Sequence, residues 1–405
     1  MKKISLSVIF LFGIFLFSFG QNFWIQKDSV NGSGKGSCSN FILFNEGYIL
    51  GGLDDFSFKR KMYSYSPFQN DWDSELSIGG LNNDGLERAS ASSFSINNKG
   101  YLCLGQGSSS AYLNDLWEFN PETQSWTQKA DFIGTARKQA VSFSINNFGY
   151  VGTGQDATGL KKDFYKYDPL LNVWTQLSDF AGTARRQAVG FSMDGNAFVG
   201  TGDDGVLQND FWMYVGLTDT WIQKANFPGT PRAGATGWGT FPTAYIATGE
   251  DVNFEFKKDV WEYNYFLNSW VQVADLMGPA RKNAVSFAID GIGYLGTGYN
   301  GVFLDDFYAY YGIVGTEEIE NNFTSTIFPN PAKELVYVQM DLENISDLTL
   351  QLFSITGTNV TSAITYVIKE KTMEVNISNL QSGNYYYELK NQKSTHKSTG
   401  KLMIL

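Results

Sequence analysis

The chain of 405 residues has only one histidine, His396, and two cysteines, Cys38 and Cys103. Without a histidine in the first three quarters of the chain, no His/Cys cluster can hold zinc there and no Ser-His-Asp or Cys-His set can form. Charged residues make up 18% and the net charge is −11, so the basic footprint of a nucleic-acid binder is missing. We expect no metal, no cofactor and no nucleic-acid partner.

Proline is also scarce, with 9 residues, whereas the chain has 42 glycines and 16% aromatic residues. This combination favours many short β-strands joined by tight turns over helices. The length exceeds what one compact core accommodates. We therefore predict an all-β protein of two or three domains.

Long apolar runs are absent except at the N-terminus. Lys2 and Lys3 precede an apolar run that ends near Phe19, and Ser18 and Gly20 provide small residues before a cleavage point at Gln21. This pattern predicts a secretory signal peptide over residues 1–20 and no transmembrane segment in the mature chain. The first cysteine lies far beyond the cleavage point, so a lipoprotein anchor is not supported.

Tryptophan recurs with a period of about 50 residues, at positions 24, 72, 126, 174, 221 and 270. Each repeat also has a cation before its first apolar run: Lys35, Arg88, Arg137, Arg185, Arg232 and Arg281. Each has a glycine seventeen residues after that cation: Gly52, Gly105, Gly154, Gly202, Gly249 and Gly298. A third run follows, for example Asp115-Leu-Trp and Asp210-Phe-Trp, and is replaced by Lys61-Met-Tyr in the first copy. Each unit thus contains four short runs that alternate with period two, which predicts a four-stranded antiparallel sheet.

The paired glycines Gly51-Gly52, the aromatic third strand and the tryptophan that opens the fourth strand resemble kelch repeats of the galactose oxidase-like β-propeller class. The resemblance covers about residues 22 to 312, although Gly-Thr-Gly (Gly152 to Gly154) replaces adjacent glycines in most copies. The last third strand is followed by Glu317 instead of a tryptophan, whereas Trp24 opens a fourth strand with no blade before it. We predict that the N-terminal strand closes the last blade, which gives a six-bladed propeller over residues 21–313.

The composition changes after Gly312, with an acidic linker predicted over residues 314–327. Beyond it, four short runs predict a small β-sandwich over residues 328–405: Leu335 to Met340, Leu348 to Ile355, Met373 to Ile377 and Tyr385 to Leu389.

Four motifs of this module resemble the type A C-terminal sorting domain of the type IX secretion system: Phe328-Pro-Asn-Pro, Leu352-Phe-Ser-Ile-Thr-Gly, Leu380-Gln-Ser-Gly-Asn-Tyr and Gly400-Lys-Leu-Met-Ile-Leu. The resemblance implies export through the periplasm and outer membrane of a Bacteroidetes-type bacterium. The secretion machinery would recognise residues 328–405, and this module is usually removed afterwards. The protein would then be released or attached to the cell surface, and the sequence leaves both open. An ordinary adhesive β-sandwich is the alternative.

The two cysteines occupy repeat positions that other copies fill mostly with alanine or glycine. Cys38 aligns with Ala91 and Ala140, and Cys103 aligns with Gly152 and Gly200. Small slots of this kind favour simple packing over a disulfide, despite the oxidising compartment.

The loops before the first strand and between the second and third strands lie on the same face of a propeller. One mouth of the central channel is therefore predicted to carry the six cations Lys35, Arg88, Arg137, Arg185, Arg232 and Arg281 beside the four acids Asp54, Asp156, Asp204 and Asp251. Either each arginine pairs with an acid or a backbone carbonyl between blades and recurs because the fold repeats, or the guanidinium forks bind an anion or an acidic partner. Loop aromatics on this face are further candidates for contact: Phe56, Tyr112, Phe254, Phe256, Tyr299 and Phe303.

Copper chemistry of the galactose oxidase type needs histidines that the propeller lacks. We predict a secreted or cell-surface propeller without enzymatic activity that binds an extracellular protein or glycan. The alternative is a carbohydrate-active enzyme of the kelch sialic acid epimerase type, which works with paired acid and base groups and no metal.

Overall fold

A computed structural model describes residues 22–55, 57–80, 86–312, 325–340, 348–354, 359–369, 371–391 and 397–405. The predicted signal peptide over residues 1–20 lies outside the described residues, as does most of the predicted linker. No helix in the described part of the chain is long and apolar enough to cross a membrane.

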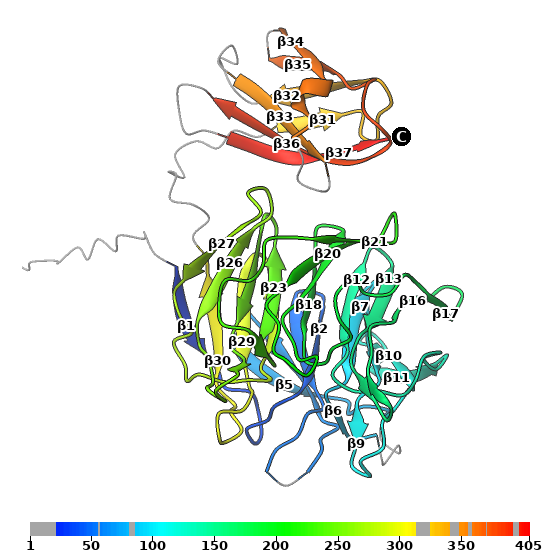
Figure 1. Cartoon of the computed structure of the whole chain (residues 1–405), viewed down its shortest axis with the longest axis vertical. Helices are drawn as coiled ribbons and strands as arrows, with labels where there is room; N and C mark the ends of the chain where they lie inside the picture. The colour runs from blue at the N-terminus through cyan, green and yellow to red at the C-terminus, as the bar shows by residue number, and fades with distance from the viewer. Residues whose placement is uncertain are drawn as a thin grey trace, which may run out of the picture.

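Six four-stranded antiparallel sheets form the first and larger part of the molecule (Figure 1). Blade 1 consists of β2 (Ser39–Leu43), β3 (Glu46–Leu50), β4 (Met62–Ser66) and β5 (Asp71–Glu75). Blade 2 consists of β7 (Ser92–Ile96), β8 (Lys99–Cys103), β10 (Leu116–Asn120) and β11 (Ser125–Lys129). Blade 3 consists of β12 (Val141–Ile145), β13 (Phe148–Gly152), β16 (Phe164–Asp168) and β17 (Val173–Gln176). Blade 4 consists of β18 (Val189–Met193), β19 (Asn196–Gly200), β20 (Phe211–Val215) and β21 (Thr220–Gln223). Blade 5 consists of β23 (Thr236–Thr240), β24 (Thr243–Ala247), β26 (Val260–Asn264) and β27 (Ser269–Val273). Blade 6 consists of β28 (Val285–Ile289), β29 (Ile292–Gly296), β30 (Phe307–Tyr311) and β1 (Phe23–Lys27).

The N-terminal strand closes the ring. β1 pairs antiparallel with β30, with Trp24 opposite Tyr310, and so becomes the outer strand of blade 6. The innermost strands touch in the order β2, β7, β12, β18, β23, β28 and back to β2. The prediction of a six-bladed propeller closed by the N-terminal strand is therefore confirmed.

Five of the six repeated tryptophans tie their blade to the one before it, whereas the indole N–H of Trp221 in blade 4 has no hydrogen-bond partner among the described residues. The indole N–H of Trp72 donates to the Asp28 carbonyl at 2.9 Å, and that of Trp174 donates to the Ala130 carbonyl at 3.0 Å. Trp24, Trp126 and Trp270 make the equivalent bonds. The tryptophan period of about 50 residues is thus a period of blade-to-blade contacts.

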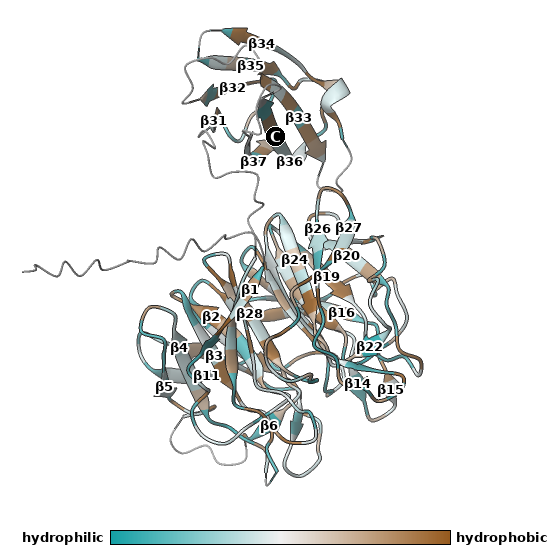
Figure 2. Cartoon of the chain, turned by 90° about the vertical axis from the view of Figure 1, so that its left-hand side faces the viewer, coloured by the Kyte–Doolittle hydropathy of each residue, from teal (hydrophilic) through white to brown (hydrophobic). Residues whose placement is uncertain are grey.

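Close approach between blades also explains a repeated glycine in the second strand. A Cβ on Gly47 would lie 2.1 Å from the ring of Phe287, and one on Gly293 would lie 2.4 Å from the indole of Trp238. The first-strand aromatic of one blade therefore lies directly on the backbone of the next blade. Figure 2 shows the hydrophobic residues running through the strands of the blades.

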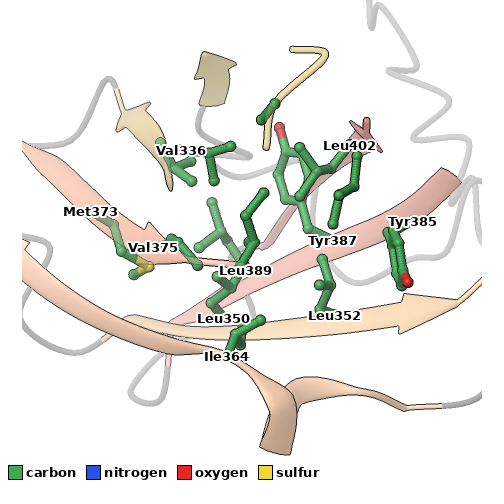
Figure 3. Packing of buried hydrophobic residues seen from close by; sticks show 14 of the residues in the cluster. Val336, Leu350, Leu352, Ile364, Met373, Val375, Tyr385, Tyr387, Leu389 and Leu402 are labelled. Carbon is green, nitrogen blue, oxygen red and sulfur yellow. The ribbon is translucent and has the colours of Figure 1, made fainter. Parts of the chain in front are cut away.

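The C-terminal module is a sandwich of a four-stranded and a three-stranded sheet. The first sheet contains β31 (Ser325–Phe328), β32 (Leu335–Met340), β35 (Thr372–Asn376) and β34 (Thr365–Lys369), and the second contains β33 (Leu348–Ser354), β36 (Gly383–Asn391) and β37 (Lys397–Ile404); a short 3-10 turn, η1 (Thr361–Ala363), lies between β33 and β34. Val336, Leu350 and Leu389 belong to the core between the sheets (Figure 3). Strand β31 includes residues 325–327, which the sequence analysis assigned to the linker, because these residues pair with β32.

Candidate functional site

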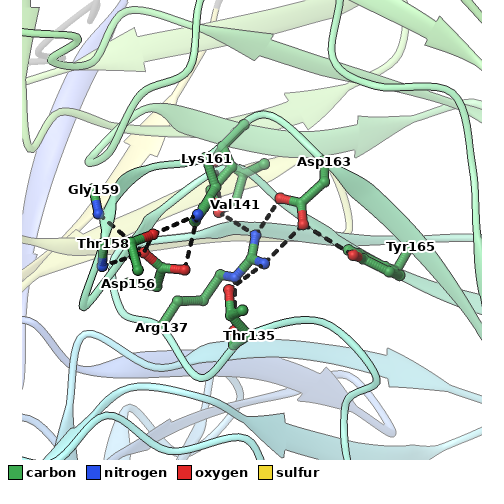
Figure 4. Close-up of polar contacts among 10 residues, drawn as sticks. Thr135, Arg137, Val141, Asp156, Thr158, Gly159, Lys161, Asp163 and Tyr165 are labelled. Carbon is green, nitrogen blue, oxygen red and sulfur yellow. Dashed lines mark hydrogen bonds and ion pairs between the residues drawn. The ribbon is translucent and has the colours of Figure 1, made fainter.

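The five repeat arginines lie beneath the surface at the channel end of the propeller, each at most 1% exposed. Arg137 shows the arrangement (Figure 4): Nη1 and Nη2 donate to the two carboxylate oxygens of Asp163 at 2.5 and 2.8 Å. Nη1 also donates to the Thr153 carbonyl and Nε to the Thr135 carbonyl, so all three guanidinium nitrogens are engaged. The other pairs are Arg88 with Asp115, Arg185 with Asp210, Arg232 with Asp259 and Arg281 with Asp306.

In three of these pairs the arginine lowers the pKa of the aspartate. Burial alone would raise the pKa of Asp115, but the hydrogen bonds and charge of Arg88 outweigh it, and the pKa lies below its usual value. The pKa of Asp163 beside Arg137 and that of Asp259 beside Arg232 are lowered for the same reasons. A buried guanidinium without a carboxylate would be strongly destabilising, and the third-strand aspartate removes that cost.

Blade 1 is the exception at both positions. Lys35 replaces the arginine, and Lys61 stands where the other blades have the aspartate. The Lys35 ammonium donates to the Asn31 carbonyl at 2.7 Å and lies 4.7 Å from the centre of the Tyr63 ring. Burial lowers its pKa. The joint loss of arginine and aspartate in one copy is the sequence signal that these two residues are partners.

The four predicted acids cap the loops between the second and third strands. Asp156 accepts hydrogen bonds from the backbone of Thr158 and Gly159 and pairs with Lys161 at 2.9 Å. Asp54 pairs likewise with Lys59, and Asp251 with Lys257. Asp204 accepts from the Val206 amide and has no lysine at the matching position, where Gln208 stands.

The structure thus brings the ten predicted residues to one end of the propeller but does not leave the cations open at the channel mouth. The five arginines form ion pairs with the aspartates at the start of the third strands, and three of the four predicted acids form ion pairs with lysines. The physical reason is that a cation at this depth needs a fixed counter-charge, which the spacing of the predicted rings alone did not identify.

The channel itself is ringed by backbone hydrogen bonds. The residue two positions after each cation donates its N–H to the carbonyl of the equivalent residue in the preceding blade, at 2.8 to 3.1 Å. The six residues of this closed ring are Ser37, Ser90, Gln139, Gln187, Gly234 and Asn283, all with positive φ. A cavity of about 140 Å³ lies inside the ring.

The side chains that do face the channel rim stand one position after the cations and one position after the repeat glycines. Successive residues of an extended segment point to opposite sides, so the neighbour of a buried arginine points outward. The short ladders β6 (Arg88–Ala89) with β9 (Gln106–Gly107) and β22 (Arg232–Ala233) with β25 (Glu250–Asp251) build this rim, and single bridges do so in other blades. These positions are not among the predicted site residues, although the alternation of side chains along an extended segment locates them.

Three rim cations link neighbouring blades. The Lys138 ammonium donates to Gln106 Oε1 at 2.7 Å, and the Lys282 ammonium pairs with Glu250 at 2.7 Å. Arg186 donates to Gln155 at 2.7 Å and pairs with Asp203 at 2.9 Å. These side chains are partly exposed, unlike the arginines beneath them.

An aromatic cluster lies beside the Lys282–Glu250 pair. The rings of Phe256 and Tyr299 are 6.1 Å apart and those of Tyr299 and Phe303 are 5.0 Å apart, each half-buried. The Lys282 ammonium lies 5.6 Å from the centre of the Phe256 ring. All three aromatics are among the predicted contact residues. Of the other three, Phe254 is exposed, Tyr112 lies under Lys138, and Phe56 is outside the described residues.

Both cysteines are free. Burial raises the pKa of the Cys38 thiol to about 12, and burial also raises the pKa of Cys103 above its usual value. The interpretation of both as packing residues is in accord with this geometry.

Comparison with known proteins identifies the second part of the chain. Residues 326–405 match the family described as secretion system C-terminal sorting domain. The chain ends in a sorting domain. The protein is therefore exported by the type IX system to the cell surface or the medium, and the sorting domain addresses that machinery.

For the propeller the comparisons show the fold. A solved structure titled "Structure of YjhT" is 17% identical, with a TM-score of 0.58, and the match covers 70% of this chain and 96% of that one. At this identity the likeness shows a kelch-type β-propeller fold and carries no information about activity. Among curated proteins, none matches the chain.

Proposed function

We propose that the exported propeller binds a neutral glycan at the channel rim and does no chemistry on it. The observation that carries the proposal is the half-exposed cluster of Phe256, Tyr299 and Phe303 beside the Lys282–Glu250 pair. Aromatic faces pack against the C–H faces of sugar rings, and a few fixed polar groups orient the hydroxyls.

The charges at the rim favour a neutral sugar over an anion. The arginine forks that would hold a carboxylate are already bound to aspartates, and Lys282 and Arg186 each have a carboxylate partner of their own. At these groups an anionic ligand would have to displace a carboxylate, whereas Lys138 is bonded to the amide oxygen of Gln106. A neutral sugar hydroxyl can instead donate to Glu250 and accept from Lys282 without breaking the pair.

The acids at this end support binding without acid catalysis. Among the aspartates that pair with the repeat arginines or cap the loops, every resolved pKa shift is downward: Asp115, Asp156, Asp163, Asp204, Asp251 and Asp259. A general acid that works near neutral pH needs a raised pKa instead. These groups hold loops and arginines.

The test is calorimetric titration of the full chain with neutral and acidic oligosaccharides chosen from a glycan array. Tyr299→Ala is expected to weaken binding of a neutral glycan about tenfold or more, as loss of about 1.4 kcal/mol would. Phe68→Ala is the matched control, because Phe68 is an exposed aromatic in a turn at the opposite end of blade 1.

Four results would contradict the proposal. Binding that survives Tyr299→Ala and Phe303→Ala would place the ligand elsewhere, and a preference for acidic sugars that depends on Lys282 would favour an anion site. Conversion of a bound sugar, followed by NMR, would favour the epimerase-type alternative. If no glycan binds, an extracellular protein becomes the favoured partner.

A further inference from the structure

A tyrosine of the sorting domain is buried in the propeller. Tyr386 on β36 is 2% exposed, and its ring stacks on Phe241 with centroids 5.0 Å apart. Tyr265 and Phe266 lie on its other sides at 5.7 and 6.2 Å. Its hydroxyl donates to the Asp194 carbonyl of blade 4 at 3.1 Å.

Of the aromatic residues that receive Tyr386, Tyr265 has an aromatic equivalent in no other blade, whereas Phe241 and Phe266 correspond to Phe44 and Phe68 of blade 1, which are both exposed. Between the first and second strands, four of the other five blades have turns built on Asn or Asp with Gly or Asn, such as Asn97-Asn98 and Asp290-Gly291, whereas blade 5 has Phe241-Pro242. Between the third and fourth strands, blade 5 has Tyr265-Phe266. The equivalent of Phe266 in blade 1 is Phe68, which is 98% exposed.

Two turns that both carry aromatics at one blade end form an apolar patch that water would otherwise contact. The patch is one unit, because the Tyr265 amide donates to the Pro242 carbonyl at 3.1 Å. In the structure the sheet of β33, β36 and β37 faces this end of the propeller, opposite the short strands β6 and β9 of the channel rim (Figure 1).

We propose that Phe241, Tyr265 and Phe266 form a docking site for the protein's own sorting domain, with Tyr386 as its anchor. Phe353 of β33 adds a second aromatic contact, 5.5 Å from Phe266. The docked domain is held in one orientation while the channel rim at the far end stays open. Removal of the sorting domain after export then uncovers the patch.

The contact is local, which makes it sensitive to single substitutions. Beside Tyr386 the two domains enclose a crevice of about 840 Å³, lined by Tyr150 and Lys166 of the propeller and by Asn330 and Lys401 of the sorting domain. The Lys401 ammonium lies 6.0 Å from the centre of the Tyr386 ring. The aromatic contacts between the two domains are those of Tyr386 and Phe353 with the blade 5 patch.

The proposal is tested on the full chain by small-angle scattering and hydrogen exchange. Tyr386→Ser and Phe266→Ser are each expected to increase the radius of gyration and to speed exchange in the two blade 5 turns about tenfold. Phe68→Ser, at the same turn position of blade 1, is expected to change neither quantity.

Unchanged scattering and exchange in Phe266→Ser would overturn the docking site. If Tyr386→Ser unfolds the sorting domain, Phe266→Ser still decides, because that residue belongs to the propeller. Scattering of the unsubstituted chain that requires two independently moving domains would also overturn it. None of these results depends on glycan binding at the rim.

Discussion

Arg232 and Asp259 form a two-pronged ion pair inside blade 5, with Nη1 and Nη2 at 2.6 and 2.8 Å from the two carboxylate oxygens. The indole N–H of Trp261 donates to the same carboxylate at 2.8 Å. Trp117 and Trp212 do the same in blades 2 and 4, and the hydroxyls of Tyr165 and Tyr308 do so in blades 3 and 6. The repeated Asp-x-Trp or Asp-x-Tyr motif is therefore the receptor for the buried arginine.

Removing one member of this pair should destabilise the propeller strongly. Arg232→Ala and Asp259→Ala should each lower the free energy of unfolding by about 3–5 kcal/mol, because each leaves an unpaired buried charge. The double variant should lose less than the sum. Arg186→Ala, which breaks a partly exposed pair, should lose less than about 1 kcal/mol. Denaturant unfolding measures all four; equal losses for Arg186 and Arg232 would contradict this interpretation.

Acid should destabilise the propeller as the pH falls below the usual pKa of an aspartate. The pKa values of Asp115, Asp163 and Asp259 are lowered in the folded state, so the unfolded chain binds protons that the folded chain does not. The stability they contribute is present above their usual pKa of about 4 and is lost as the pH falls through the lower folded values.

Melting temperatures measured from about pH 7 to pH 3 check this sign. Asp259→Asn should start from a lower melting temperature at neutral pH and lose less on acidification than the unsubstituted chain. A melting temperature that rises between about pH 4 and pH 3 would be the opposite of the expected result.

Trp24 should matter far more than its position near the N-terminus suggests. Its indole is buried, donates to the Ala274 carbonyl at 3.0 Å and lies in β1, the strand that joins the two ends of the ring. Trp24→Ala should cost about 3–5 kcal/mol in unfolding free energy. Ile25→Ala, at an exposed position of the same strand, should cost less than about 0.5 kcal/mol. Thermal unfolding compares the two, and equal effects would mean that β1 does not close the ring.

The two thiols should be unreactive in the folded protein. Cys38 and Cys103 are free, and burial raises the pKa of both thiols, so few thiolates form near neutral pH. A thiol reagent should react with neither cysteine in the native chain and with both cysteines after denaturation without reductant. Failure to detect thiols in the denatured chain would reveal a disulfide.

The repeat architecture was predictable because each repeated residue type has a repeated contact. Trp72 and Trp174 bond the preceding blade, Gly47 admits the ring of Phe287, and Glu317 in place of a tryptophan indicates that the N-terminal strand completes blade 6. The sorting domain was recognisable from four ordered motifs. Such features are local in sequence, so a single chain reveals them.

The composition of the channel rim was decided by the tertiary structure. Spacing placed Arg137 and Asp156 at the same end of the propeller, but burial paired Arg137 with Asp163 and Asp156 with Lys161, and exposed Lys138 instead. The contact of Tyr386 with Phe241, 145 positions apart, likewise has no local signal beyond the unusual turns of blade 5. A sequence determines which residue types recur; which of them are buried with a partner and which face water depends on packing between segments that only the folded chain brings together.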